Sequence, residues 1–137
     1  MKISTTGRYS LSILTELAKI SEKNDENSNG FVSLKIISDK LGISFKYLEK
    51  IASLLVKNGY ISVSRGKQGG YKLTKKVEEY NIGEILKLTE KNMEQLQCVK
   101  DPETCKKNSA CKRQRIFSGL DKVINDYLTQ FTLRDII

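Results

Sequence analysis

The sequence predicts a mainly α-helical fold with one two-stranded β-hairpin and a long C-terminal helix. Apolar residues recur at helical spacing in several separate segments, whereas one segment alternates apolar and polar residues around a glycine-rich turn. The length of 137 residues suffices for one compact unit with an appended element, but not for two independent cores. We therefore expect one folded unit with extensions.

The first predicted helix runs from Ser4 to about Glu22. Small hydroxyl residues at its start suit helix capping. Its main apolar stripe consists of Leu11, Leu14, Leu17 and Ala18. Ile13 and Ile20 widen this face, so we expect the helix to pack against more than one neighbour. Residues 24–30 are polar and glycine-containing, as is typical of a surface loop.

Two further helices follow, separated by a tight turn. Ser33 is suited to cap the second helix, and Gly42 to end it. Ser44 then begins a third helix over 44–58. The residues predicted to face the core are Leu34, Ile37 and Leu41 in the second helix and Leu48, Ile51, Ala52 and Leu55 in the third. Two helices joined by a short turn, the second with a basic outward face, are the parts of a helix-turn-helix.

A β-hairpin is predicted directly after the third helix. Gly59 ends that helix, Ile61 and Val63 then alternate with serines, and alternation resumes at Tyr71 after a basic, glycine-rich stretch over Arg65–Gly70. An ordinary surface hairpin would give the same pattern. Its position after a helix-turn-helix favours the wing of a winged helix, with 44–58 as its recognition helix.

The C-terminal part contains a short helix and a long one. Asn81 is suited to cap a helix over 82–90, and a longer helix begins at about Lys112. The apolar stripe of the long helix consists of Ile116, Leu120, Ile124, Tyr127 and Phe131. Packing against helix one of the same chain and against a symmetry mate would cover this stripe, which predicts a homodimer. A core helix within one chain is the alternative.

We expect these elements to form two parts of the chain. Residues 1–80 form a winged helix-turn-helix DNA-binding domain whose first helix also packs on the dimer helix. Residues 81–137 form a cysteine-containing loop and the dimerisation helix.

The charge distribution indicates a polyanionic partner. The formal net charge is +8, and the segment from Lys35 to Lys76 alone has ten basic residues against two acidic ones, a balance of +8. A solvated lysine face is the alternative explanation. The sequence shows no apolar run of membrane-spanning length and no secretory signal, so we expect a cytoplasmic protein. Catalysis is not expected, because the chain has no His and no phosphate-binding glycine loop.

The predicted DNA-binding residues lie on the third helix and in the wing. They are Ser44, Lys46, Tyr47, Glu49, Lys50, Arg65 and Lys67. The glutamate can accept a hydrogen bond from a cytosine amino group, and the two helical lysines can reach guanine or phosphate. The serine and the tyrosine suit phosphate contacts that fix the register. The wing arginine suits a narrow minor groove, where the negative potential is greatest.

The three cysteines, Cys98, Cys105 and Cys111, have the spacing C-x6-C-x5-C. An odd number of cysteines argues against a disulfide scaffold. Structural zinc is disfavoured, because it normally takes four ligands in closely spaced pairs and no His is present. Iron–sulfur clusters are held by thiolates, and the basic surroundings would lower thiol pKa values and offset an anionic cluster. On the residues alone, a cluster and three ordinary cysteines remain equally supported.

Four stretches of the sequence resemble the Rrf2 family of bacterial regulators, and within it the IscR-like iron–sulfur cluster regulators. The stretches are MKISTTGRY at 1–9, ISFKYLEK at 43–50, KNGYI at 57–61 and RGKQGGY at 65–71. The resemblance covers nearly the whole chain, including the cysteine loop. It implies a dimer of winged-helix domains, DNA contacts at all of the residues named above except Lys67, and an iron–sulfur cluster on the three cysteines, either 2Fe-2S or 4Fe-4S.

Two departures from the family pattern concern the cluster. The first gap between cysteines is one residue longer than is usual, and Gln114 stands where cluster regulators commonly place a histidine. Related nitric-oxide sensors use an aspartate where this sequence has Arg8. The fourth ligand is therefore unassigned among Gln114, Asp101, Glu103 and an exogenous thiol or water. A cluster-free regulator that senses thiol oxidation or a partner protein is the alternative function.

Overall fold

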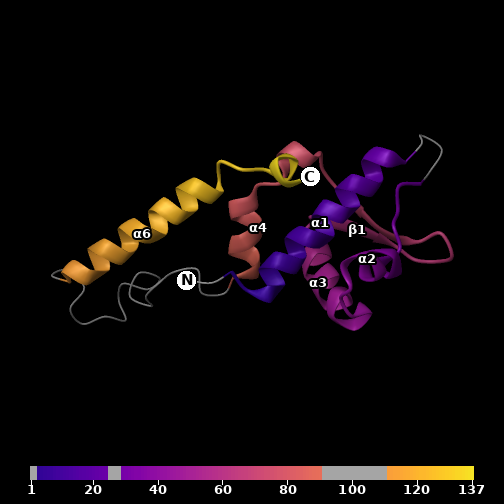
Figure 1. Ribbon diagram of the computed structural model, residues 1–137, viewed down its shortest axis with the longest axis horizontal. Helices are drawn as coiled ribbons and strands as arrows, with labels where there is room; N and C mark the ends of the chain where they lie inside the picture. Colours follow the sequence, from indigo (N-terminus) through magenta and orange to yellow (C-terminus); the bar gives the residue numbers. More distant parts are fainter. Residues whose placement is uncertain (1–2, 25–28, 91–110) are drawn as a thin grey trace.

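A computed structural model describes residues 3–24, 29–90 and 111–137 (Figure 1). The elements, in chain order, are α1 (Thr5–Lys23), α2 (Leu34–Leu41), α3 (Phe45–Lys57), β1 (Ile61–Ser64), β2 (Gly70–Leu73), η1 (Val77–Glu79), α4 (Ile82–Thr89), α6 (Lys112–Leu128) and η4 (Leu133–Ile136). The predicted fold class, mainly helical with a single β-hairpin and a long C-terminal helix, is confirmed.

Helix α1 is the centre of the fold. Ser4 caps its N-terminus, where the side-chain hydroxyl accepts a hydrogen bond from the backbone N–H of Gly7 at 3.0 Å. Its buried face packs against α2, α3, α4, β2 and η4. The wide apolar face predicted for this helix is explained by this number of neighbours. We refer to α1–α4, β1, β2, η1 and η4 together as the body.

Helices α2 and α3 form the predicted helix-turn-helix. Gly42 ends α2 with a φ of 64°, and the Ser38 hydroxyl donates to the carbonyl of Ile43 at 2.6 Å, which fixes the turn. Ser44 caps α3 as predicted, because its side chain accepts from the N–H of Tyr47. The residues predicted to face the core from α3 are all buried: Leu48, Ile51, Ala52 and Leu55.

The hairpin is the predicted wing. Strands β1 and β2 are antiparallel, with Ile61 opposite Leu73 and Ser64 opposite Gly70. Val32 forms an isolated antiparallel β-bridge to β2, in which its N–H and carbonyl both hydrogen-bond to Tyr71 at 2.8 Å. The sequence analysis did not predict this pairing. It anchors the wing to the segment that leads into α2.

One residue of the wing departs from the expected alternation. Ile61 is 1% exposed, whereas Val63 is 48% exposed. Helix α3 packs against β1, while the tip of the hairpin extends beyond the helices (Figure 1). Strict alternation predicts burial only where a second layer is present.

A buried tyrosine joins the end of the wing to α3. Tyr80 is fully buried, and its hydroxyl donates to the carbonyl of Tyr60 at 2.6 Å and accepts from the N–H of Thr74 at 2.9 Å. These contacts satisfy backbone groups where the chain leaves both elements.

Helix α6 projects away from the body, as Figure 1 shows. It contacts α4, and the chain after it returns to the body. The N–H of Ile82 donates to the carbonyl of Phe131 at 3.0 Å, and Gly83 lies directly against Thr129. Phe131 was expected on the stripe of the long helix. It instead lies beyond the helix, which stops at Leu128 so that the chain can pair with the start of α4.

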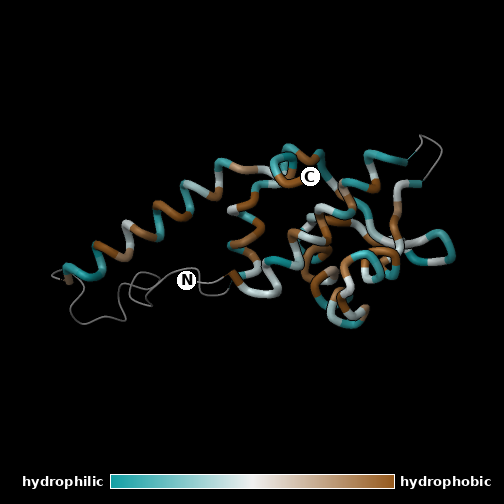
Figure 2. The backbone as a smooth tube through the Cα atoms, in the orientation of Figure 1, coloured by the Kyte–Doolittle hydropathy of each residue, from teal (hydrophilic) through white to brown (hydrophobic). Residues whose placement is uncertain are grey.

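None of the α6 residues is buried in the single chain described. Ile116, Val123 and Tyr127 are 68%, 65% and 59% exposed, and apolar and polar segments alternate along the helix (Figure 2). The alternative that α6 is a core helix of one chain is therefore wrong. Among the described residues, no helix combines the length and apolar character needed to cross a membrane.

Candidate nucleic-acid interface

Helix α3 presents a polar face opposite its buried one. The side chains of Lys46, Glu49, Lys50 and Ser53 are exposed, whereas their neighbours on the other face fill the core. The burial pattern follows from the amphipathic sequence, because the four core positions fix the rotation of the helix. Three of the predicted contact residues, Lys46, Glu49 and Lys50, thus share one solvent-facing surface.

The wing tip carries the other cationic groups. Arg65 and Lys67 are exposed in the turn between β1 and β2. Gly66 has a φ of 110°, and a Cβ at Gly70 would collide with the backbone carbonyl of Val32. The glycines of this tip are therefore required by its backbone path. The side-chain amide of Asn29 donates to the carbonyl of Gln68 at 2.9 Å, which ties the tip to the chain before α2.

Glu49 links the recognition helix electrostatically to the wing. Burial raises the pKa of the Tyr71 hydroxyl, and the nearby negative charge of Glu49 raises it further. Helix α3 packs against the first strand of the wing, β1, so the recognition helix and the wing are neighbours in the body. We call the predicted set on both elements the recognition surface; it comprises Ser44, Lys46, Tyr47, Glu49, Lys50, Arg65 and Lys67.

Tyr47 differs from the other members because it also packs on α1. Its ring makes an edge-to-face contact with Tyr9, with centroids 5.6 Å apart and planes at 82°. Its hydroxyl lies 3.4 Å from the hydroxyl of Thr6. The half-buried Tyr47 therefore joins the start of α3 to the start of α1. Its predicted phosphate contact stays a prediction, and the sequence analysis missed its packing role.

Of the three cysteines, Cys111 alone lies in the described residues, and Cys98 and Cys105 lie outside them. Cys111 is partly exposed at the N-terminus of α6. The backbone N–H of Gln114 lowers the pKa of its thiol most, followed by the N–H and the positive charge of Arg113. Such a thiol fits the role of a thiolate ligand. No cluster of three metal-binding side chains is found in the part of the chain that the structure describes.

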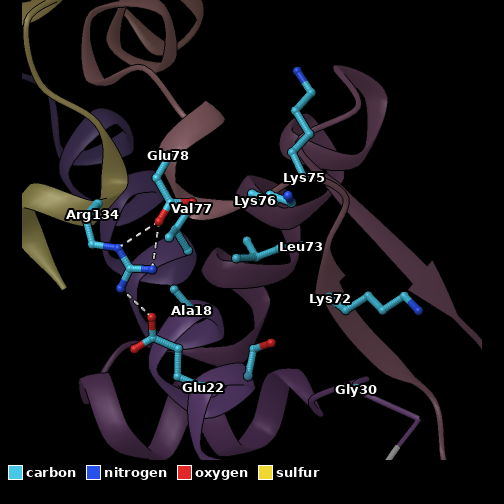
Figure 3. A pocket seen from close by; sticks show the side chains of 11 residues that line it. Ala18, Glu22, Gly30, Lys72, Leu73, Lys75, Lys76, Val77, Glu78 and Arg134 are labelled. Atoms are coloured by element: carbon cyan, nitrogen blue, oxygen red, sulfur yellow. Dashed lines mark hydrogen bonds and ion pairs between the residues drawn. The ribbon is translucent and has the colours of Figure 1, made fainter. Parts of the chain in front are cut away.

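A hollow of about 470 Å³ lies away from the recognition surface, between α1, β2, η1 and η4 (Figure 3). Arg134 dominates one side of it, where its guanidinium binds the carboxylates of Glu22 and Glu78. The amines of Lys72 and Lys75 point away from this arginine and lie over the rings of Phe31 and Tyr60. The ion pairs fasten η4 to α1 and η1.

Comparison with known proteins agrees with this arrangement. Residues 3–137 match the model of a family described as "Rrf2: Iron-dependent Transcriptional regulator". The chain is 32% identical to the HTH-type transcriptional regulator NsrR of Shouchella clausii over 138 aligned residues, which cover 100% of this chain and 89% of the relative.

Two solved structures have the same fold. T. potens IscR superposes with a TM-score of 0.76 at 27% identity, covering 99% of this chain and 85% of that chain. CymR, the global cysteine regulator of B. subtilis, superposes with a TM-score of 0.72 at 31% identity, covering 99% and 95%.

Proposed function

Because the chain belongs to the Rrf2 family and is a DNA-binding transcriptional regulator, not an enzyme, we propose that its recognition surface contacts a double-stranded operator. In this proposal the exposed face of α3 enters the major groove and Arg65 contacts the neighbouring minor groove. Lys46, Glu49 and Lys50 then face base edges and phosphates.

One observation carries this proposal: exposed cationic groups from two elements share one side of a well-packed body. Lys46 and Lys50 are exposed on α3, Arg65 and Lys67 are exposed on the wing, and α3 packs against the first strand of the wing. The buried face of α3 and the hydrogen bonds of Val32 fix both elements without using these groups. A rigid basic surface of this kind favours a polyanion of regular shape.

Charge reversal tests the proposal. The duplex for this test is first selected from a random library with the wild-type protein. At moderate salt the variant K46E/K50E/R65E should bind this duplex at least about a hundredfold more weakly than the wild type does, because phosphate neutralisation is replaced by repulsion. The matched control K23E/K76E/K87E changes the net charge by the same amount at exposed lysines outside the recognition surface. It should retain most of the affinity. Equal losses in the two variants would show that only the net charge matters.

We propose further that the exposed stripe of α6 is covered by a second copy of this chain. Ile116, Val123 and Tyr127 are exposed on a helix that projects from the body. Neighbouring large apolar side chains exposed in this way commonly mark an interaction surface. A two-fold dimer would bury it against the same face of its partner. Residues 1–80 would then serve as the DNA-binding domain and 81–137 as the cysteine loop and dimerisation helix.

Sedimentation equilibrium tests the dimer. The variant I116D/V123D should remain folded and become monomeric at concentrations where the wild type is dimeric, because two charges would be desolvated in the interface. S118D adds one charge at an exposed position on the opposite side of the same helix and should stay dimeric. An unchanged dimer in I116D/V123D would exclude this interface.

The third part of the proposal is that Cys98, Cys105 and Cys111 hold an iron–sulfur cluster, 2Fe-2S rather than 4Fe-4S, that controls DNA affinity. The lowered thiol pKa of Cys111 and the iron dependence in the family description support it. A bound cluster would supply an iron centre whose oxidation or loss changes the charge beside α6. Anaerobic purification should give about two irons and two sulfides per chain for a 2Fe-2S cluster; colourless protein without either after reconstitution would contradict it.

A cluster-free thiol sensor is the second candidate, and Cys111 is the observation that favours it. A partly exposed thiol with a lowered pKa is more reactive toward oxidants than an ordinary one. Replacing the three cysteines with serine should then abolish the response of DNA binding to peroxide in a protein that holds no iron. A peroxide response that survives this replacement would exclude the thiol mechanism.

A further inference from the structure

We propose that Glu90 is a positioning residue for DNA recognition: its carboxylate holds the N-terminus of α1, and through the first turns of α1 it fixes Tyr47 on α3. This inference rests on the proposed function, because it takes α3 as the element that contacts DNA. Glu90 is the C-cap residue of α4 and is not a member of the recognition surface.

The Glu90 carboxylate binds the first residue of the α1 cap twice. Its Oε1 atom accepts hydrogen bonds from the backbone N–H of Ser4 at 3.0 Å and from the Ser4 hydroxyl at 2.6 Å. The same hydroxyl accepts from the N–H of Gly7 at 3.0 Å, so the carboxylate and the cap form one network. A negative charge at a helix N-terminus is also stabilised by the helix dipole. Loss of the carboxylate would leave Ser4 without both of these bonds.

The absence of a side chain at Gly7 leaves room for the Glu90 carboxylate beside α1. Gly7 is buried in α1, and a Cβ at this residue would overlap the Oε1 atom of Glu90 and lie 3.0 Å from the Thr89 hydroxyl. Glycine is a poor helix residue, so its presence within α1 is explained by the close approach of α4. Any larger residue at Gly7 would displace the carboxylate from Ser4.

The same two turns of α1 contact the recognition helix. The Thr6 hydroxyl lies 3.4 Å from the Tyr47 hydroxyl, and the Tyr9 ring packs edge-to-face on the Tyr47 ring. Tyr47 follows Lys46 directly, and its N–H is bound by the Ser44 cap of α3. A shift of the α1 N-terminus would therefore move the first turn of α3, which carries several members of the recognition surface.

Glu90 directly precedes the segment of the sequence that contains two of the cysteines. The next residues, 91–110, include Cys98 and Cys105. Within the described residues, hydrogen bonds join Glu90 to Ser4 and Thr6 to Tyr47, and Ser4 and Thr6 lie two residues apart at the start of α1.

The test compares E90A with E84A, which removes the same charge from an exposed position on α4. We measure affinity for the duplex selected by the wild type and for a scrambled duplex of equal length. E90A should lower the ratio of the two affinities by about fivefold or more, as expected for a coupling above roughly 1 kcal/mol. E84A should not change it. A partly unfolded population lowers both affinities equally, so this ratio does not respond to a loss of stability alone.

Two further variants sharpen the test. E90Q retains an acceptor for the Ser4 N–H and should recover part of the ratio. G7A should lower the ratio in the wild type but add little in the E90A background, because both substitutions break the same contact. An E90A ratio equal to that of E84A, or equal effects of G7A in both backgrounds, would overturn the positioning role.

The two proposals fail in different ways. If K46E/K50E/R65E loses binding while E90A keeps the wild-type ratio, the recognition surface stands and the role of Glu90 is excluded. If K46E/K50E/R65E binds as tightly as the wild type, the recognition surface itself is wrong, and Glu90 with it.

Discussion

The helices of the body and helix α6 are all amphipathic, but the apolar side chains of the body are buried and those of α6 are not. Leu14, Leu17, Leu48 and Leu55 of the body are at most 1% exposed, whereas α6 has no buried residue in the single chain described. The helices of the body surround α1, while α6 contacts α4 near its own C-terminal end and projects from there (Figure 1). The body buries its apolar residues within one chain, whereas the apolar side chains of α6 stay exposed in it, which is why we propose a second copy as their cover.

Because of this difference, we expect the body to determine the folding stability of one chain and α6 to determine its association with a second copy. The recognition surface sits on the body, so its geometry depends on the core of one chain. The stripe on α6 contributes little to that core, and its apolar residues are available for a second copy. Substitutions of the same kind should therefore have different consequences in the two regions.

The largest difference is expected for leucine truncation. L55A in the body should lower the free energy of unfolding by about 2–5 kcal/mol, because it leaves a cavity in a fully buried site. L120A on α6 should cost less than about 1 kcal/mol in the monomeric I116D/V123D background, since that side chain is not buried there. Urea unfolding followed by circular dichroism measures both values. Equal losses would show that α6 belongs to the core after all.

Glycine substitution should differ in sign between the two regions. G70A should destabilise the protein by about 1–3 kcal/mol, because φ at Gly70 is 150° and the new Cβ would meet the Val32 carbonyl. G119A, with nothing within 4 Å of the new Cβ, should stabilise α6 by up to about 1 kcal/mol. G70A should also weaken DNA binding through the wing, which an electrophoretic mobility shift would detect. A neutral G70A would argue against the close approach of the wing to Val32.

The smallest expected effect is a pKa shift inside the body. Burial and the charge of Glu49 raise the pKa of Tyr71, so its contribution to stability is fully present below the pKa of an unfolded tyrosine and is lost as pH rises above it. E49Q should lower the pKa of Tyr71 toward its ordinary value. Ultraviolet titration of E49Q and of E49Q/Y71F isolates this one hydroxyl. An unchanged pKa would mean that α3 and the wing do not face each other at Tyr71.

The sequence was sufficient to predict the helices of the body, because their caps and apolar periods are local signals. Ser33, Ser44 and Asn81 cap the helices for which they were proposed, and Gly42 ends α2. The fold class and the family also followed from the sequence. The predicted DNA contacts, the cluster ligands and the domain division stay predictions.

The features that sequence patterns did not reveal depend on contacts between distant residues. The pairing of Val32 with Tyr71, the contact of Tyr47 with Tyr9, and the bonds from Glu90 to Ser4 join segments that no local period connects. Gly7 was the available signal for the last of these, because a glycine inside a helix often marks a close approach. The end of α6 before Phe131 was missed for the same reason.

Hydrogen–deuterium exchange tests the division between body and α6 most directly. On addition of the selected duplex, amides in 44–50 and 65–70 should become protected, while amides in 116–127 should respond to protein concentration and not to DNA. Protection of 116–127 by DNA, with no change in 44–50 and 65–70, would contradict the assignment of DNA recognition to α3 and the wing.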